Sequence, residues 1–365
     1  MMPTIVGNRP LIERFDREIN GGTLSHAYIL EGPAGSGKHT LARYICAALA
    51  CEHSLKRQAM MEDDGQTGMF DDPTPIISKV SHAPESIPCG ECRSCYKVLN
   101  GICPDIRFIG REGKASIGVD SVRFLKTDVL FPPNDLDTKI YIIEDAEAMT
   151  LQAQNALLLT LEEPPPYVLF LLLCNGVENL LETIRSRAPV LHTECIEEAA
   201  IRAHLLESST AAMRLNERSP KEFDAVLLSS NGCIGQAVSL LDAKARKPIL
   251  KQRGVTNSFL SVCLSKRSAE VSEVVSLFGN KRDEVSATIG MVRLALRDLL
   301  LLKKSETVRL LYFADREAAL ELSDRFPTHT LLTLHQATGQ ALSGLDRNGN
   351  VRITLIRMCM DAGIL

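Results

Sequence analysis

Short apolar runs alternate with segments of helical periodicity over the first 195 or so residues. The runs that predict buried strands are 27–30, 106–109, 139–143, 168–173 and 189–192. Strands of a parallel sheet are near-continuous apolar runs because helices cover both faces of the sheet. The pattern therefore predicts an α/β domain over residues 1–195, with a parallel sheet between helices.

Past residue 197 the strand pattern ends, and apolar residues recur at helical spacing. Three short segments of this kind follow one another: 201–206, 223–228 and 234–241. They predict a small all-helical domain over residues 196–245, which the stretch Lys244–Pro248 ends. Longer amphipathic patterns continue to the last residues and predict a helical bundle over 246–365. An acidic, proline-containing segment, 53–88, predicts a mobile insertion in the first domain.

Composition narrows the class of protein. A chain of 365 residues suits two or three domains, and a net charge of −4 argues against a freestanding, strongly basic nucleic-acid binder. The longest apolar run, Val168–Cys174, is far shorter than the roughly 20 residues that span a bilayer, so we expect no membrane segment. The start of the chain lacks the pattern of an export signal, and the eleven cysteines then predict reduced thiols and metal ligation in a cytoplasmic protein.

A glycine-rich turn lies between strand 27–30 and the helix predicted at 41–49. It reads E-G-P-A-G-S-G-K-H-T from Glu31 to Thr40. Glycines let successive backbone N–H groups point at phosphate oxygens at a helix N-terminus, and Lys38 would reach the outer phosphates. The alternative is a glycine-rich turn without a ligand. The residues predicted to contact nucleotide here are Gly32, Gly35, Ser36, Gly37, Lys38, His39 and Thr40.

His39 departs from the pattern of this loop. The residue after the lysine is normally Ser or Thr, whose hydroxyl binds magnesium, and an imidazole is no oxygen ligand. Thr40 carries a hydroxyl, but one helical residue further on it is rotated about 100° away from the phosphate side. We therefore expect ATP or ADP with Mg²⁺ to bind weakly, and hydrolysis to be more impaired than binding.

Three cysteines at intervals of three predict a metal site. Cys89, Cys92 and Cys95 are spaced so that their thiolates can surround one tetrahedral ion. A fourth ligand is needed, and Cys51 and Cys103 are the candidates. The site would hold structural Zn²⁺ in a loop-rich segment with little core of its own. The alternative is a set of unliganded buried cysteines.

The apolar strand 139–143 ends in two carboxylates, Glu144 and Asp145. Nucleotide-hydrolysing enzymes hold magnesium and orient the attacking water at this place. Asp followed by Glu is the usual order, whereas here the longer acid comes first. The alternative is a strand-end charge and an N-cap for a helix starting near Ala146.

Together these motifs resemble the clamp-loader subunits of the bacterial replicative DNA polymerase III holoenzyme, members of the AAA+ family, and most closely the delta prime branch. Besides the phosphate loop and the cysteines, the resemblance is carried by residues 7–8, 26–28, 154–158, 161–165 and 183–187. It is dense from residue 4 to about 195 and thinner beyond. It implies an AAA+ P-loop domain with a zinc module over about 51–103, a helical lid domain over 196–245 and a helical collar domain over 246–365.

The resemblance also implies residue roles. Glu144 and Asp145 take the metal and water-activating positions, and Asn175 falls at the first sensor. Arg187 matches the arginine of a Ser-Arg-Cys motif that acts in trans on the next subunit's nucleotide, although Ala188 replaces the cysteine. The family's first zinc cysteine ends the helix after the phosphate loop. This selects Cys51 over Cys103 as the fourth ligand.

Three hydrolytic positions depart from the family pattern: His39, the Glu144-Asp145 pair, and Gly235, where motor subunits carry a nucleotide-sensing arginine. Their joint loss favours a non-hydrolysing subunit that donates Arg187 to a neighbouring ATPase. The implied partners are gamma/tau and delta subunits in a hetero-pentamer, with the sliding clamp and primed DNA bound through the complex. The alternatives are a gamma/tau motor subunit with true ATPase activity and an unrelated AAA+ protein that remodels polypeptides.

Overall fold

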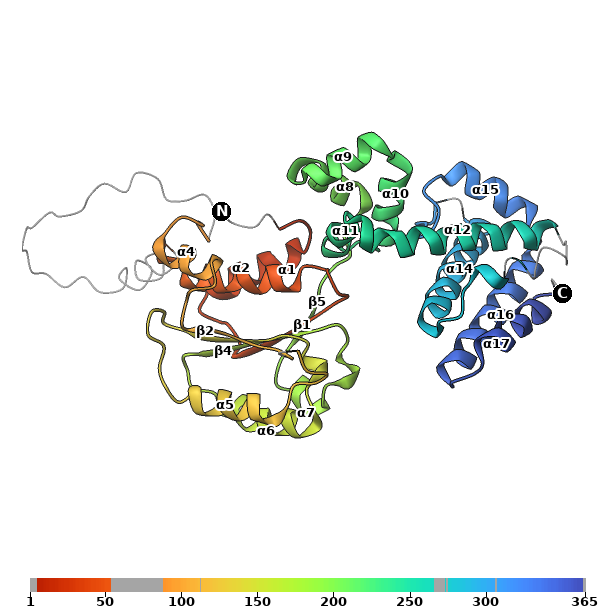
Figure 1. Cartoon of the computed structure of the whole chain (residues 1–365). Coiled ribbons are helices and arrows are strands. Elements are labelled where there is room, and N and C mark those ends of the chain that lie inside the picture. The colour runs from red at the N-terminus through yellow and green to blue at the C-terminus, as the bar shows by residue number, and fades with distance from the viewer. Residues whose placement is uncertain are drawn as a thin grey trace, which may run out of the picture. The chain divides into compact units, whose positions relative to one another are not determined.

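The computed structural model divides the chain into two compact units, Met1–Ile196 and Glu197–Leu365 (Figure 1). The residues that it describes are 5–53, 88–111, 113–265, 273, 275–305 and 307–363. Nearly all of the expected insertion, residues 53–88, therefore lies outside the described residues.

The first unit contains a five-stranded sheet. Its strands are β1 (Ala27–Glu31), β2 (Ile106–Ile109), β3 (Lys139–Ile143), β4 (Val168–Cys174) and β5 (Val190–His192). They lie in the order β2-β3-β4-β1-β5, and every neighbouring pair is parallel. The predicted α/β fold with a parallel sheet is confirmed, and each strand lies within one residue of its predicted bounds.

Helices cover both faces of this sheet (Figure 1). One face carries α1 (Arg9–Asn20), α2 (Lys38–Ala50) and α4 (Arg93–Leu99), and the other carries α5 (Val119–Asp128), α6 (Leu151–Glu162) and α7 (Glu182–Arg185). Two short 3-10 turns, η1 (Ala146–Ala148) and η2 (Val177–Asn179), follow β3 and β4.

Side chains of successive strand residues enter the two hydrophobic cores in turn. In β1, Ala27 and Ile29 pack in the core that includes Leu157 of α6, and Tyr28 and Leu30 pack in the core that includes α2. Alternation along a strand sends successive side chains to opposite faces of the sheet. Because both faces are covered, every residue of β3 and β4 is buried, which explains why β4 is apolar throughout and β3 is apolar after Lys139.

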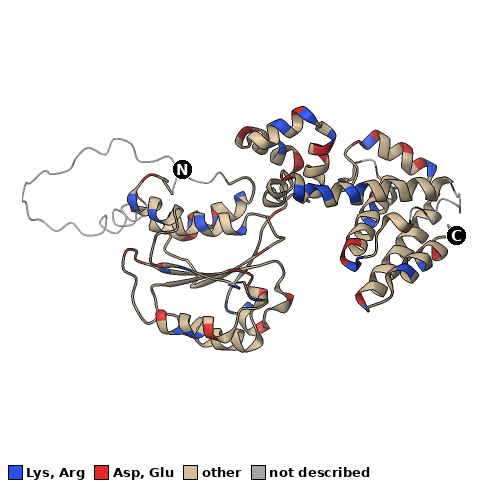
Figure 2. Cartoon of the chain, viewed as in Figure 1, with Lys and Arg blue, Asp and Glu red and all other residues tan. Residues whose placement is uncertain are grey.

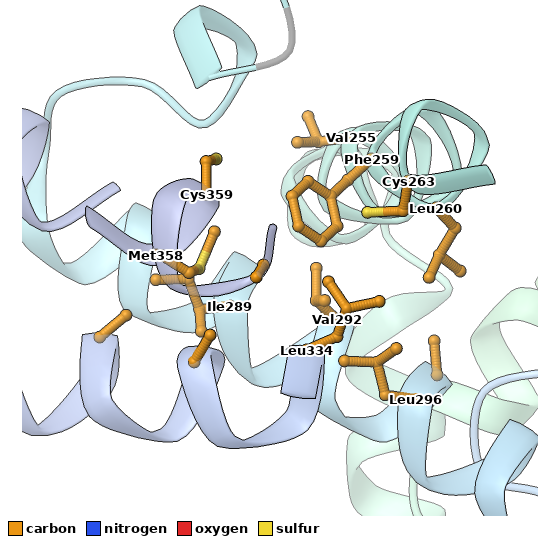
Figure 3. Close-up of a cluster of buried hydrophobic side chains, with 14 of the residues drawn as sticks. Val255, Phe259, Leu260, Cys263, Ile289, Val292, Leu296, Leu334, Met358 and Cys359 are labelled. Atoms are coloured by element: carbon orange, nitrogen blue, oxygen red, sulfur yellow. The ribbon is translucent and has the colours of Figure 1, made fainter. Parts of the chain in front are cut away.

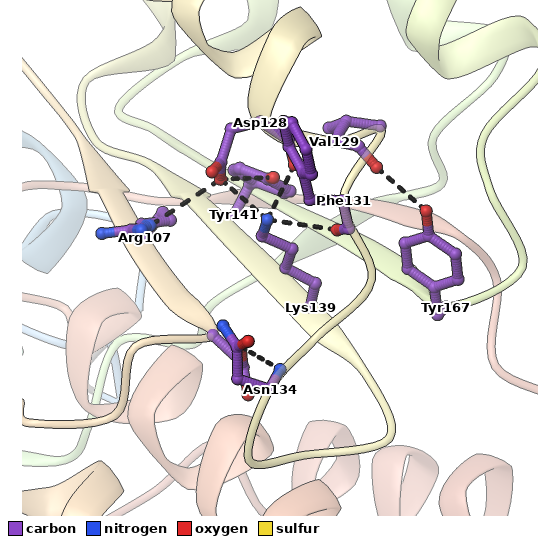
Figure 4. A network of polar contacts seen from close by, with 9 residues as sticks. Arg107, Asp128, Val129, Phe131, Asn134, Lys139, Tyr141 and Tyr167 are labelled. Atoms are coloured by element: carbon purple, nitrogen blue, oxygen red, sulfur yellow. Dashed lines mark hydrogen bonds and ion pairs between the residues drawn. The ribbon is translucent and has the colours of Figure 1, made fainter.

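A buried ion pair joins the end of α5 to β3 (Figure 4). The Lys139 Nζ atom lies 3.1 Å from Asp128 Oδ2 and donates to the carbonyl oxygens of Asp128 and Phe131, at 2.7 and 3.3 Å. The Tyr141 hydroxyl donates to the same carboxylate at 2.8 Å, and Arg107 lies 3.7 Å from it. Burial raises the pKa of Asp128, but the hydrogen bonds from Tyr141 and Lys139 outweigh it and hold that pKa below its usual range.

The second unit is helical throughout its described residues. Its helices are α8 (Glu198–Ser208), α9 (Thr210–Arg218), α10 (Pro220–Ser229), α11 (Ile234–Leu240), α12 (Ala243–Ser265), α14 (Arg282–Leu302), α15 (Arg316–Arg325), α16 (Thr328–Asp346) and α17 (Val351–Asp361). Helices α12, α14, α16 and α17 share one apolar core, in which Phe259, Val292, Leu334 and Met358 are almost fully buried (Figure 3).

The stretch Lys244–Pro248, expected to end a domain, is part of helix α12. Pro248 lies near the start of this helix, where its missing N–H removes one backbone hydrogen bond without ending the helix. Basic residues gather over the first half of α12 (Figure 2). The division into a lid over 196–245 and a collar over 246–365 stays a prediction. Among the described residues, no helix is both long enough and apolar enough to cross a bilayer.

Candidate nucleotide site and metal centre

The glycine-rich loop connects β1 to α2, as the sequence predicts. Gly37 is the N-cap of α2 with a φ of 97°, and Gly35 has a φ of 81°. Both values lie in the left-handed region that favours glycine. At Gly32, a Cβ atom would stand 1.8 Å from the Thr193 hydroxyl oxygen. A side chain at this position would therefore push the loop away from the end of β5.

Ser36 is used inside the protein rather than at the loop surface. Its hydroxyl lies 2.8 Å from the Thr193 hydroxyl, and its carbonyl oxygen accepts from Asn8 Nδ2 at 3.4 Å. Asn8 is buried with a φ of 54°, and its Oδ1 atom accepts from the backbone N–H of Glu194 at 2.7 Å. The loop is thus joined by hydrogen bonds to the segment that leaves β5.

Lys38 lies folded over the loop. Its Nζ atom donates to the carbonyl oxygens of Gly32 and Pro33, the latter at 3.0 Å, and to Asn175 Oδ1 at 3.2 Å. The structure therefore brings together the predicted lysine and the predicted sensor residue, which are 137 residues apart. The charge and the donors needed to bind phosphate are present at the loop.

The other predicted hydrolytic residues are paired with each other or with nearby cations. His39 Nδ1 lies 3.2 Å from Glu144 Oε1, and Asp145 Oδ2 lies 3.1 Å from Arg111 Nε. Asp145 has a φ of 50° and stands at the N-cap position of η1, but its side chain makes no capping hydrogen bond. His39 occupies the position where phosphate-binding loops usually carry a magnesium-binding hydroxyl. Its imidazole contacts Glu144 instead.

Sequence reasoning missed Glu147, which lies in η1. Its Oε1 atom accepts from the Nδ2 atom of Asn175 at 2.6 Å and from the backbone N–H of Asn175 at 3.2 Å. Burial, followed by the charges of Glu147 and Glu31, raises the pKa of the Cys174 thiol to about 12. Cys174 is therefore a neutral core residue beside a group of carboxylates. The only signal in the sequence was a third acid two residues after the Glu144-Asp145 pair.

Four cysteines converge between α2 and α4. The sulfur atoms of Cys51, Cys89, Cys92 and Cys95 all lie within 4.8 Å of one another. Around a tetrahedral zinc ion with Zn–S bonds of about 2.3 Å, sulfur atoms stand about 3.8 Å apart. The observed 4.0 Å between the sulfur atoms of Cys89 and Cys95 is close to this spacing. The cluster is consistent with a structural zinc site.

Backbone groups orient the thiols of this cluster. The backbone N–H of Cys92 points at Cys89 Sγ, and that of Cys95 points at Cys92 Sγ, both at 3.4 Å. Burial opposes ionisation of Cys89, but the backbone hydrogen bonds, from Glu91 first and then Cys92, outweigh it and lower the pKa of that thiol to about 6. The donor set thus suits a metal ion that takes thiolate ligands, and four ligands close the site to substrate.

The structure distinguishes the two candidates for the fourth ligand. Cys51 is the C-cap of α2 and belongs to the cluster, whereas Cys103 does not. Cys103 is buried beyond α4, where burial raises the pKa of its thiol. The geometry therefore agrees with the family resemblance, which pointed to Cys51.

Arg187 follows the short helix α7. Its Nη2 atom lies 2.6 Å from Glu162 Oε1, and its Nη1 atom donates to the carbonyl oxygen of Thr183 at 2.8 Å. Both charged side chains are about a third or more exposed. Gly235, the remaining departure from the motor pattern, lies in α11 of the second unit.

The sheet order, with the phosphate loop after β1, acids at the end of β3 and a polar residue after β4, defines an α/β protein of the AAA+ class. The family model described as "DNA polymerase III, delta subunit" matches residues 7–67 and 76–197. The chain belongs to this family, as a delta-prime-type clamp-loader relative of the gamma and tau subunits.

Several known proteins resemble the chain. The DNA polymerase III subunit tau of Bacillus subtilis (strain 168) is 28% identical over 238 residues, which is 65% of this chain and 36% of that protein. Subunit gamma of Buchnera aphidicola subsp. Schizaphis graminum is 29% identical over 183 residues, 50% of this chain and 42% of that protein. The chain thus spans less than half the length of these curated relatives.

A solved structure, a DNA polymerase III gamma subunit-related protein from Thermotoga maritima, is 19% identical to the chain. The match covers 96% of this chain and 98% of that one, with a TM-score of 0.35. A score this low establishes no likeness of overall structure.

Proposed function

We propose that this chain is a non-hydrolysing subunit of a bacterial clamp loader, which helps to load the sliding clamp on primed DNA. Its partners would be the gamma/tau and delta subunits in a hetero-pentamer, and it would meet clamp and DNA through that complex. A role in bacterial replication would place it in the cytoplasm. Zinc would act structurally, by joining the start of α4 and the residues just before it to the end of α2.

The observation that best supports a loss of ATP hydrolysis is the contact between His39 and Glu144, whose Nδ1 and Oε1 atoms lie 3.2 Å apart. Magnesium prefers oxygen ligands in octahedral geometry, and here an imidazole stands in the position of the usual hydroxyl. The same imidazole engages one of the two strand-end acids. The phosphate-binding glycines and Lys38 remain, so we propose weak binding of ATP or ADP without turnover by this subunit.

Arg187 would supply this subunit's contribution to catalysis. Its side chain is partly exposed after α7, and its own subunit lacks the parts needed to use it. An arginine placed against the γ-phosphate stabilises charge that develops in the transition state. We propose that Arg187 reaches the nucleotide of the adjacent ATPase subunit, where it acts in trans.

Magnesium-dependent ATP turnover by the isolated chain tests the non-hydrolysing assignment. We expect negligible turnover, equal to that of Lys38→Ala. Clear turnover that Lys38→Ala abolishes would favour the second candidate, a gamma/tau-type motor subunit. Two observations favour this second candidate: the loop keeps its glycines and its lysine, and the chain is similar to curated gamma and tau subunits. Co-purification with the polymerase clamp would exclude a remodelling protein that acts on polypeptides.

A further inference from the structure

Lys38, the residue expected to bind the outer phosphates, is held by acceptors of its own chain. These are the carbonyl oxygens of Gly32 and Pro33 and the Oδ1 atom of Asn175. A lysine ammonium has three N–H donors, and this set of acceptors matches that number. A phosphate oxygen that binds Lys38 must therefore displace at least one of these contacts.

The amide of Asn175 is oriented from both sides. A carboxylate, Glu147, can only accept hydrogen bonds, and an ammonium, Lys38, can only donate them. Only one orientation of the amide satisfies both, with Nδ2 toward Glu147 at 2.6 Å and Oδ1 toward Lys38 at 3.2 Å. The amide thus turns an acceptor toward the loop, where a phosphate oxygen would need a donor.

Glu147 also brings negative charge close to the loop. Its Oε2 atom is buried and has no hydrogen-bond partner among the described residues. Glu147 and Lys38 contact the two ends of the same Asn175 amide, so the carboxylate and the ammonium are separated by that amide alone. A carboxylate in such a place attracts the ammonium and repels an incoming anion.

We propose that Glu147 is a positioning residue that keeps the nucleotide affinity of this loop low by turning Asn175 toward Lys38. Glu147 acts through the amide of Asn175 and does not itself touch nucleotide. The inference rests on the proposed function in one respect, that the loop can hold ATP. It gives Glu147 the opposite effect to that of a magnesium-holding acid, whose removal would weaken binding.

The test is titration of the full chain with MgATP by isothermal calorimetry, for the wild type, Glu147→Ala and Glu147→Gln. We expect Glu147→Ala to bind ATP at least about tenfold more tightly, which corresponds to about 1.4 kcal/mol. Glu147→Gln keeps the size but removes the charge, so a smaller gain is expected, and this variant decides the question if Glu147→Ala does not fold. Unchanged or weakened binding would overturn the proposal.

Two controls distinguish this relay, in which Glu147 acts through the Asn175 amide, from a general effect of negative charge on ATP binding. Glu178 is an exposed acid that also affects the Cys174 pKa, so Glu178→Gln is a matched control and should leave ATP affinity nearly unchanged. In a double-mutant cycle, Asn175→Ala should remove most of the gain from Glu147→Ala and leave only the smaller part that comes from removing the negative charge. An equal gain in Glu178→Gln, or a full effect of Glu147→Ala without Asn175, would overturn the relay.

A third control establishes where the nucleotide binds. Adding Lys38→Ala to Glu147→Ala should abolish the gained affinity, and binding that survives would place ATP elsewhere and overturn the proposal. If no variant binds ATP, the inference fails by itself. The proposed function is judged separately, by clamp loading in the reconstituted complex.

Discussion

Replacing Arg187 with alanine is expected to impair a neighbouring subunit's ATP site while this chain stays folded. Arg187 is tied to its own subunit by Glu162 at 2.6 Å, and the two side chains are 33% and 43% exposed. An ion pair this exposed contributes about 0–1 kcal/mol. The variant should therefore lose no more than about 1 kcal/mol of folding free energy.

Breaking the ion pair with Glu162 would cost Arg187 the same amount of free energy when it turns toward a partner. A cost of about 1 kcal/mol reduces the population that reaches the partner by a factor of about 5 at most. An arginine at the γ-phosphate contributes roughly 10³ to 10⁵ in rate. A contribution of this size in trans would exceed the cost of leaving Glu162 by two orders of magnitude or more.

The assay is DNA-stimulated ATP hydrolysis and clamp loading by a reconstituted complex that carries Arg187→Ala. Arg185→Ala is the matched control, because Arg185 is an exposed arginine at the end of the same short helix. We expect both activities to fall in Arg187→Ala, with other ATP sites masking part of the loss, and to stay near wild type in the control. Wild-type loading by Arg187→Ala, or equal losses in both variants, would refute the reasoning.

Three further predictions concern the metal site, the buried ion pair and the phosphate loop. Cys92→Ser should lose the one zinc ion per chain, as metal analysis would show, and proteolysis should show a looser segment around the cluster while the sheet stays folded. The control Cys103→Ser should keep its zinc. Zinc retained in Cys92→Ser and lost in Cys103→Ser would reject the ligand set. Asp128→Ala should lower the free energy of unfolding in urea by about 3–5 kcal/mol at pH 7, because it leaves the buried Lys139 ammonium without a counter-charge and the Tyr141 hydroxyl without its acceptor. Since the folded-state pKa of Asp128 is lowered, its contribution is present above the unfolded-state pKa and is lost as the pH falls through the folded-state value; equal stability of variant and wild type at pH 7 would contradict this. His39→Thr alone should not restore fast ATP turnover, because parts of a catalytic unit act non-additively; motor-like turnover in an ATPase assay would disprove it.

The sequence predicted the interior strands β1, β3 and β4 well because they are buried on both faces. An unbroken apolar run such as Val168–Cys174 predicts a buried strand without further information. The glycine spacing predicts the phosphate loop between β1 and α2. The helix that contains Pro248 was harder to predict from the sequence, because a proline near the start of a helix resembles the boundary between two domains. There the packing of the later turns of α12 against α14 outweighs the local signal.

The site was only partly predictable. The Cys89, Cys92 and Cys95 spacing indicates a metal, but spacing alone could not select Cys51, which reaches the cluster because α2 ends beside α4. The contact of Glu147 with Asn175 depends on β3 and β4 being neighbours in the sheet. Such pairings arise from sheet order, which short-range periodicity does not encode.

The sheet order also has a consequence for biosynthesis. The apolar strand β1 is an interior strand, and its two neighbours are β4 and β5, which begin at Val168 and Val190. A ribosome that adds about 5–20 residues per second needs roughly 7 to 30 s to travel from Glu31 to Val168. During that interval the strand edges of β1 have no native partner on the nascent chain. Synthesis of this protein therefore includes a period in which an apolar strand has both edges unpaired, which is the condition that favours aggregation.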